Sequence, residues 1–157
     1  MLLNNQVVPT KEQFVTFMKT YPKDEPVVMI NLLKFKDKSG KGEESGREAY
    51  KRYAQNVQRL LDKVGGKVLW AGEVNMTVIG DPTDHPDMVA IVEYPSAQKF
   101  IEMSTSAEYQ PIGVDREISL TYGGLLASST SCRKCSSFSL VAPINRVTFP
   151  AAVLSVA

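Results

Sequence analysis

The sequence predicts an α+β domain with a four-stranded antiparallel sheet, and three observations carry this prediction. Four apolar segments of strand length are separated by two amphipathic stretches, in the order strand, helix, strand, strand, helix, strand. Turn-forming residues cluster between elements, as in GDPTDHPD at positions 80–87. The chain has 157 residues, enough for one domain with its own hydrophobic core and a short appendage.

Two helices are predicted in the first half of the chain, and both have recognisable end signals. Thr10 and Gln13 have the spacing of a capping box, and apolar residues recur at helical intervals behind them. A longer helix is expected over residues 47–64, where the Gly65-Gly66 pair supplies a left-handed stop. The first of these helices precedes the strand and helix order and is therefore an N-terminal addition to it.

The strand predicted between these helices, residues 27–35, is apolar on both faces. One face carries Val27, Met29, Leu33 and Phe35, and the other carries Val28, Ile30 and Leu32. A strand with one solvent-exposed face alternates instead between apolar and polar residues. Helices cover one face, and a second copy of the chain is the economical cover for the other. We therefore expect a homodimer.

The second half of the chain supplies the remaining elements. A strand is predicted over 68–79, bent at Gly72, and another over 88–94. Ser96 is the expected N-cap of the next helix. A short helical piece over 108–114, interrupted near Pro111, and a last strand over 118–126 complete the set. This order is the ferredoxin-like βαββαβ arrangement, with both helices on one face of the sheet.

The domain is expected to span residues 1–127 and to be followed by an atypical tail, residues 128–157. The tail has no acidic residue, many serines and an apolar end. An ordered strand extension, a disordered tail and an altered reading frame are all compatible with this composition, and we assign the tail no function. Cys132 and Cys135 have CxxC spacing but lack a second ligand pair for zinc. Their pairing in a disulfide is left open.

Several segments, taken in order, resemble one family of proteins. These are MINLLKF (29–35), the helix with Tyr50 and Tyr53, LWAG (69–72), VEYPS (92–96), and SAEYQPI (106–112) followed by Arg116. The chain resembles the family called domain of unknown function 1330 over about residues 9–127. The resemblance implies a ferredoxin-like dimeric α/β barrel, in which two sheets pack face to face. The wider superfamily includes cofactor-free monooxygenases, cyclases, isomerases and haem-degrading enzymes, so the fold leaves the reaction open.

Five residues are candidates for a ligand-binding site: Asn31, Tyr50, Tyr53, Trp70 and Arg116. Together they would make an apolar pocket with few polar groups, which is typical of small-molecule sites. We expect this pocket between the sheet and the long helix, with Arg116 at its mouth. Each residue also has a structural interpretation: packing for the aromatic residues, and a hydrogen bond to a loop or to the partner chain for Asn31.

Arg116 precedes the last predicted strand, where its guanidinium could bind a carboxylate or an enolate oxygen in two-point geometry. The structural alternative is a salt bridge to Glu93, Glu108 or Asp115. If the protein is an enzyme, Arg116 and Asn31 would stabilise negative charge, and a tyrosine or His85 would transfer the proton.

His85 is the single histidine, and no pattern in the sequence arranges a serine and an acid around it, so a Ser/His/Asp triad is not predicted. The acidic residues around it have the spacing of a turn rather than of a metal site. We therefore expect neither a metal nor a cofactor.

The composition of the chain argues against some classes of binding partner. A formal net charge of +1 provides no basic field for nucleic acid or an anionic membrane, and no long apolar run suits a membrane span. The cysteine-free main body fits a cytoplasmic protein. The leading hypothesis is a small-molecule-binding homodimer, either a binding protein or a cofactor-independent isomerase, cyclase or monooxygenase-like enzyme for a small carbonyl or aromatic compound. The rival is a non-catalytic dimer with a binding or structural role.

Overall fold

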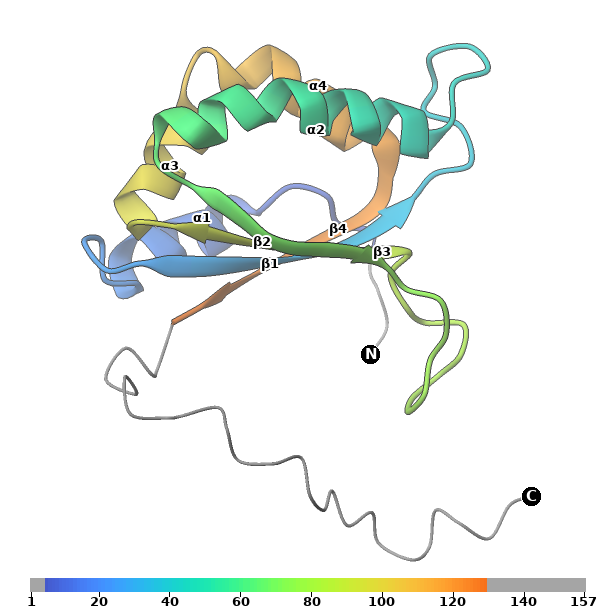
Figure 1. Ribbon diagram of the computed structural model, residues 1–157, viewed down its shortest axis with the longest axis horizontal. Coiled ribbons are helices and arrows are strands. Elements are labelled where there is room, and N and C mark those ends of the chain that lie inside the picture. The colour runs from blue at the N-terminus through green and yellow to red at the C-terminus, as the bar shows by residue number, and fades with distance from the viewer. Residues whose placement is uncertain (1–4, 130–157) are drawn as a thin grey trace, which may run out of the picture.

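The computed structural model describes residues 5–129 of the chain. Its elements follow in the order α1 (Lys11–Thr20), β1 (Val27–Phe35), α2 (Gly46–Lys63), β2 (Lys67–Glu73), β3 (Met88–Tyr94), α3 (Ala97–Thr105), α4 (Tyr109–Ser119) and β4 (Leu120–Ser128) (Figure 1). The expected tail from residue 130 onward, with Cys132 and Cys135, lies outside the described residues, and its role stays a prediction.

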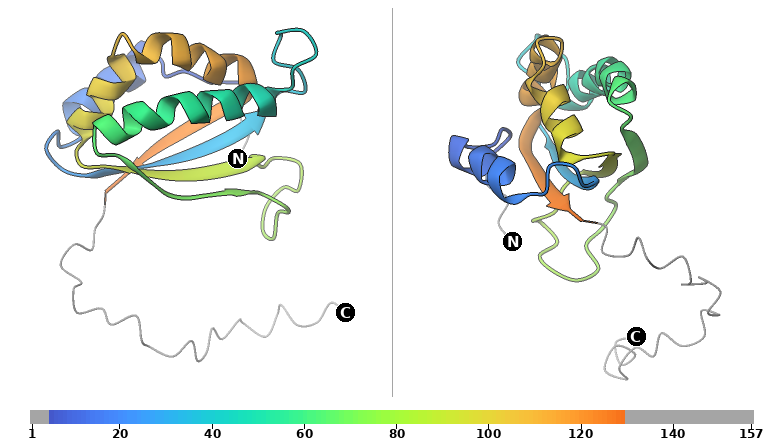
Figure 2. Two further views of the ribbon diagram at one scale, coloured as in Figure 1. Left: turned by 45° about the horizontal axis from the view of Figure 1, so that its top comes forward. Right: turned by 90° about the vertical axis from the view of Figure 1, so that its left-hand side faces the viewer.

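The four strands form one antiparallel sheet in the order β2-β3-β1-β4. Helices α2, α3 and α4 lie over one face of this sheet, while α1 lies beside the β4 edge (Figures 1 and 2). This is the ferredoxin-like topology with an added N-terminal helix, so the predicted fold class is confirmed. The other face, called the open face below, is covered by none of the described helices.

Both predicted strand faces of β1 are as expected. Val27, Met29 and Leu33 are buried under the helices, where the first two join Leu60, Leu61 and Ala97 in the core. Val28, Ile30 and Leu32 point to the open face and are half-buried. The predicted end signals of the first two helices are also confirmed. Thr10 and Gln13 form the capping box of α1, and Gly65, just beyond α2, has the left-handed backbone angle φ +74.

Three elements differ from their predicted boundaries, namely β2, α4 and β4; β4 covers Leu120–Ser128 rather than 118–126, so Ser128, expected as the first residue of the tail, pairs with Val28 in the sheet. β2 ends at Glu73 rather than Ile79, because Glu73 pairs with Met88, the first residue of β3, and no strand residue lies opposite the chain beyond it. Helix α4 runs through Pro111 without interruption, because Pro111 is its third residue. Backbone N–H groups in a first helical turn have no partner within the helix, so proline is tolerated there.

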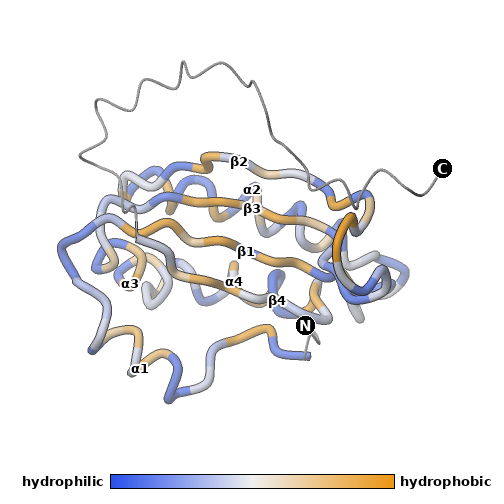
Figure 3. Tube along the Cα trace, turned by 90° about the horizontal axis from the view of Figure 1, so that it is seen from below, coloured by the Kyte–Doolittle hydropathy of each residue, from blue (hydrophilic) through white to orange (hydrophobic). Residues whose placement is uncertain are grey.

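An apolar row crosses the open face from one edge to the other. Trp70 of β2 pairs with Ile91 of β3, Ile91 with Ile30 of β1, and Ile30 with Leu126 of β4. Trp70 is 52% exposed and Leu126 is 48% exposed. Figure 3 looks onto this face and shows hydrophobic stretches along β1 and β3. Directly paired side chains lie on the same face, so the four residues form one continuous surface.

Candidate functional site

A cavity of about 750 Å³ lies on the helix side of the sheet, next to the β4 edge. Its floor is β1 and β4, its roof is α3 and α4 with one residue of α2, and its side wall is α1 with the segment 6–9. The volume is within the range of small-molecule pockets, about 300–1,000 Å³. The side wall is lightly packed: α1 has no buried residue, and its Phe17 contacts Phe100 of α3 edge-on at 5.8 Å between ring centroids.

Asn31 lies in the floor of the cavity. Alternation along β1 places it on the helix side with Met29 and Leu33, so a polar side chain interrupts an apolar floor. Its Nδ2 donates to the backbone oxygens of Ala90 at 3.3 Å and Met29 at 3.4 Å. Both distances are longer than the usual 2.9–3.0 Å, so these bonds hold the amide weakly. Its Oδ1 accepts no hydrogen bond from the described residues and is an acceptor available to a ligand.

Tyrosines and phenylalanines supply the aromatic part of the wall: Tyr53 of α2, Tyr94 of β3, Tyr109 of α4 and Tyr122 of β4, with Phe14, Phe17 and Phe100. The hydroxyls of Tyr53 and Tyr109 lie 3.4 Å apart. Burial raises the pKa of the Tyr53 hydroxyl well above its usual value, and the charge of Arg116 opposes this shift. Tyr53 therefore stays protonated at neutral pH and acts in the cavity as a hydrogen-bond donor rather than as a base.

Arg116 lies in the last turn of α4 and not in the connection before β4, because the helix continues to Ser119. Its Nη1 donates to the backbone oxygen of Val7 at 2.6 Å, and its Nη2 donates to that of Gly123 at 3.2 Å. Of the salt bridges weighed for it, those to Glu108 and Asp115 are wrong: Glu108 pairs with Lys63 and Asp115 with Arg52. The two hydrogen bonds of its guanidinium given above go to backbone carbonyls and not to a carboxylate.

Charge at the cavity wall is positive on balance. In the part of the chain that the structure describes, the charged lining residues are Lys11, Arg116 and Glu117, two cations against one carboxylate. Arg116 is half-buried, where the local dielectric is lower than in water and its charge acts more strongly. A ligand with an anionic oxygen fits this distribution better than a cationic one.

The turn that carries Arg116 is fixed by an ion cluster on the neighbouring residue. Asp115, 8% exposed, accepts from Arg52 Nε and Nη2, both at 2.8 Å, and from Lys41 Nζ at 3.0 Å. Arg52 also pairs with Glu44, which ties the loop after β1 to α2 and α4. Hydrogen bonds from Arg52 lower the pKa of the Asp115 carboxyl to about 2.

This cluster predicts a pH dependence of stability. The pKa of Asp115 is lower in the folded chain than its ordinary value of 3.8, so its contribution is complete above about pH 5 and is lost between about pH 4 and pH 2. Asp115→Asn should lower the free energy of unfolding by about 1–2 kcal/mol at pH 7, because a charged acceptor of several hydrogen bonds is removed while Arg52 and Lys41 stay partly solvated. Urea unfolding at pH 7 and pH 3 measures it. An equal deficit at both values would contradict the expectation.

The structure brings together Asn31, Tyr53 and Arg116 but not the other candidates. Tyr50 packs against Phe35 and Tyr53, each at 5.4 Å between ring centroids, and is not part of the cavity wall. Burial raises its pKa to about 12. Trp70 lies in β2, at the sheet edge opposite to β4, and on the open face. A register shift between Val68 and Trp70 turns its side chain to that face.

His85 also lies away from the cavity, in the loop between β2 and β3. Its Nδ1 is 2.7 Å from the backbone oxygen of Pro86.

Some residues of the cavity wall were not predicted from the sequence, among them Tyr109, Tyr94, and Phe14 and Phe17 of the side wall. Tyr109 belongs to the SAEYQPI segment, which was a usable signal. The position of the side wall was not predictable, because nothing in a local pattern says which sheet edge α1 joins.

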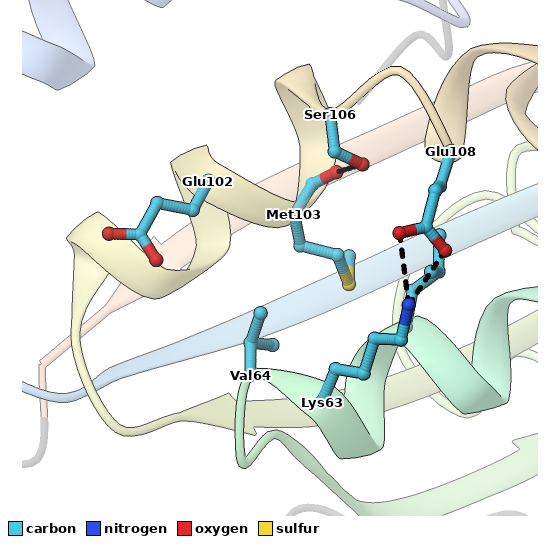
Figure 4. A pocket seen from close by; sticks show the side chains of 7 residues that line it. Lys63, Val64, Glu102, Met103, Ser106 and Glu108 are labelled. Atoms are coloured by element: carbon cyan, nitrogen blue, oxygen red, sulfur yellow. Dashed lines mark hydrogen bonds and ion pairs between the residues drawn. The ribbon is translucent and has the colours of Figure 1, made fainter.

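A second hollow, of about 110 Å³, lies where α2 ends beside α3 and the start of α4 (Figure 4). Its Met103 side chain lies between the elements, and Lys63 Nζ pairs with Glu108 across it at 2.7 Å and 2.9 Å. It is well below the size of small-molecule sites.

Within residues 5–129 no group of three or more histidine, cysteine or acidic residues is placed to hold a metal ion. Nor does that part contain a helix long and apolar enough to cross a membrane.

The fold and the cavity together define a class: a ferredoxin-like α+β chain with an aromatic-lined cavity between sheet and helices. Residues 44–126, more than half of the chain, match the family described as "Domain of unknown function (DUF1330)". The chain belongs to this family, as the sequence resemblance predicted. No match was found among curated proteins.

Solved structures similar to this chain are described as proteins of unknown function or without a stated function. A protein of unknown function from Rhodopseudomonas palustris is 30% identical, with a TM-score of 0.75, over 81% of this chain and 98% of that one. A methylated form of that protein gives 28% identity and the same TM-score over 82% and 96% of the two chains. A protein from Bacteroides fragilis, described as dimeric, of unknown function and ferredoxin-like, is 14% identical with a TM-score of 0.47 over 69% of this chain and all of that one.

Proposed function

We propose that this chain forms a homodimer in which each copy binds a small aromatic or carbonyl compound with an anionic oxygen, such as a carboxylate or an enolate. The observation that carries the ligand proposal is the cavity of about 750 Å³ with Arg116 in its wall. Aromatic walls provide the apolar contacts, and a few polar groups orient the ligand. Asn31 and the hydroxyls of Tyr53 and Tyr109 would bond a second oxygen on the ligand.

The contacts of Arg116 suggest how a ligand would enter. Its hydrogen-bond acceptors on Val7 and Gly123 are backbone carbonyls, which are weaker acceptors for a guanidinium than a carboxylate. A ligand carboxylate would therefore compete with the Val7 carbonyl for Nη1. The segment 6–9 is part of the lightly packed side wall, so its displacement would cost few buried contacts.

Binding is favoured over catalysis by the groups in the wall. Tyr53 is a donor, and His85, the one imidazole of the chain, lies elsewhere. Proton abstraction needs a base with a pKa near the working pH, and among residues 5–129 Glu117 is the one lining residue with a carboxylate. The donors of the cavity would stabilise an anion that is already formed. If the bound compound is also converted, the activity we propose is that of a cofactor-independent isomerase, cyclase or monooxygenase-like enzyme.

The ligand proposal is tested with matched pairs of acids and amides. Aromatic carboxylic acids and 2-keto acids should raise the melting temperature of the full-length protein, and their carboxamides should do so far less, because the amide lacks the charge that Arg116 pairs with. Differential scanning fluorimetry ranks the panel, and calorimetry gives the dissociation constants. If no acid binds, the cavity has no support as an anion site and the non-catalytic, structural dimer becomes the better proposal.

The dimer proposal rests on the open face. The row Trp70, Ile91, Ile30 and Leu126 spans all four strands, and a continuous apolar surface of several hundred Å² is rarely left to water. Sedimentation equilibrium at micromolar concentration should give twice the chain mass of 17.3 kDa. Trp70→Glu should shift the mass toward that of one chain, since a charge in the apolar row would be buried without a partner. A wild-type chain that sediments as a monomer would contradict the dimer.

A further inference from the structure

The loop between β2 and β3, residues 74–87, carries the most exposed large apolar side chains among the described residues. Met76 is 71% exposed, Val78 is 84% exposed and Ile79 is 95% exposed. These three residues lie within four positions, directly before the turn-forming residues 80–87. Scattered exposed apolar residues are normal, but a cluster of this kind marks an interaction surface.

The direction of this loop is set by its attachment to the sheet. Val74 N donates to Asp87 O at 2.9 Å, and Asp87 N donates to Leu33 O at 2.7 Å, so both ends of the loop are held where β1 ends and β3 begins. Asp87 also accepts from Lys34 Nζ at 2.9 Å and from the backbone N–H of Phe35 at 2.8 Å. From this base the loop projects to the side of the sheet away from α2 and α4, which is the side of the open face (Figures 1 and 2).

The area of the open face gives a reason for such a projection. Strands of about seven residues are about 23 Å long, and four of them span about 19 Å, so the face projects about 440 Å². A standard interface buries about 800 Å² of accessible surface on each partner. Side-chain relief raises the available area only in part, because the rings of Trp70 and Tyr122 lie back over Gly72 and Gly124 instead of standing out from the sheet. A stable dimer through this face therefore needs additional surface.

We propose that residues 76–79 form an arm that packs against a second copy of this chain and extends the interface of the dimer beyond the sheet. This inference rests on the homodimer proposed above and names the segment that completes it. In a dimer with two-fold symmetry the same contact occurs twice, once from each copy, so the arm contributes double its own area. The apolar side chains that water covers in one copy would then be buried against the partner.

The test is the dimer dissociation constant of the full-length chain with the arm made polar. Val78→Ser combined with Ile79→Ser should weaken dimerisation roughly tenfold or more, because two branched apolar side chains no longer leave water. Val114→Ser is the matched control: Val114 is also exposed, but it lies on α4, on the opposite side of the sheet. Its dissociation constant should equal that of the wild type. Sedimentation equilibrium measures all three proteins.

Hydrogen exchange of the wild-type protein provides a readout without substitution. The backbone amides of residues 76–79 should exchange more slowly at concentrations where the dimer forms than at dilution. An unchanged dissociation constant in the double variant, or unchanged exchange of residues 76–79, would contradict the proposed role of the arm without contradicting the dimer. The same result would follow if the arm served another partner, such as a lipid surface. A wild-type monomer at every concentration would overturn both the arm and the dimer.

Discussion

Gly46→Ala should lower the free energy of unfolding by about 3 kcal/mol, the upper part of the range for overpacked sites. Gly46 is the first residue of α2 and is buried. A Cβ atom there would lie 2.5 Å from the backbone oxygen of Lys36 and 2.8 Å from its nitrogen, and closer still to the oxygen of Ser119. These are backbone atoms, held by the bonds from Lys36 N to Ser119 O at 3.0 Å and from Gly46 N to Lys36 O at 3.1 Å, so no side chain can move aside.

Thermal and urea unfolding measure this loss, which corresponds to a melting temperature lower by roughly 6–12 °C at this chain length. Gly42→Ala is the control. Gly42 has φ +64 and no atom within 4 Å of a Cβ, so alanine there meets backbone strain alone, about 1 kcal/mol. Similar losses in the two variants would show that α2 does not depend on the close approach at Gly46.

Arg116→Gln should weaken the binding of an aromatic acid roughly 10- to 100-fold, which corresponds to the loss of a charge-assisted hydrogen bond of about 1.5–3 kcal/mol. The affinity of the matched carboxamide should stay close to the wild-type value. Arg116 also holds Val7 and Gly123, so some loss of stability is expected in this variant whatever its role in binding. The ratio of acid to amide affinity therefore decides the role, because a purely structural loss would weaken both ligands alike.

Arg59→Gln is the matched control for this experiment. It removes the same charge from the exposed surface of α2, outside the cavity wall. Surface charges beyond a Debye length are screened, so the affinity for the acid should be unchanged in this variant. Calorimetry at 0.15 M salt on the wild type and both variants gives the comparison. Equal weakening by Arg59→Gln would show that net charge, and not the Arg116 contact, attracts the acid.

Local patterns were sufficient for the elements and for the faces of β1. Seven apolar residues of Val27 to Phe35 divide between two faces, and the structure buries Val27, Met29 and Leu33 on one of them. The period of two in a strand is a property of the backbone, so this assignment needs no tertiary information. Helix caps are likewise local, because the Thr10 hydroxyl accepts from the backbone N–H of Gln13, only three residues away.

Part of the candidate site was also readable from the sequence. An amide within an apolar strand marks a polar position in a core, and Asn31 does line the cavity. Tyr53 was found by helical spacing and Arg116 by the resemblance. Trp70 was misplaced because one register shift, between Val68 and Trp70, changes the face of every later residue in β2.

The sequence by itself determined the element types, their order and the buried face of β1, because each follows from backbone periodicity and from bonds between near neighbours. Only the tertiary structure decided where the cavity lies and what Arg116 contacts. Its acceptor on Val7 is 109 residues away along the chain. Such a contact depends on which edge of the sheet α1 and the N-terminal segment join, and periodicity defines faces without specifying edges. For this reason the cavity lies beside β4 and the tryptophan lies at the opposite edge.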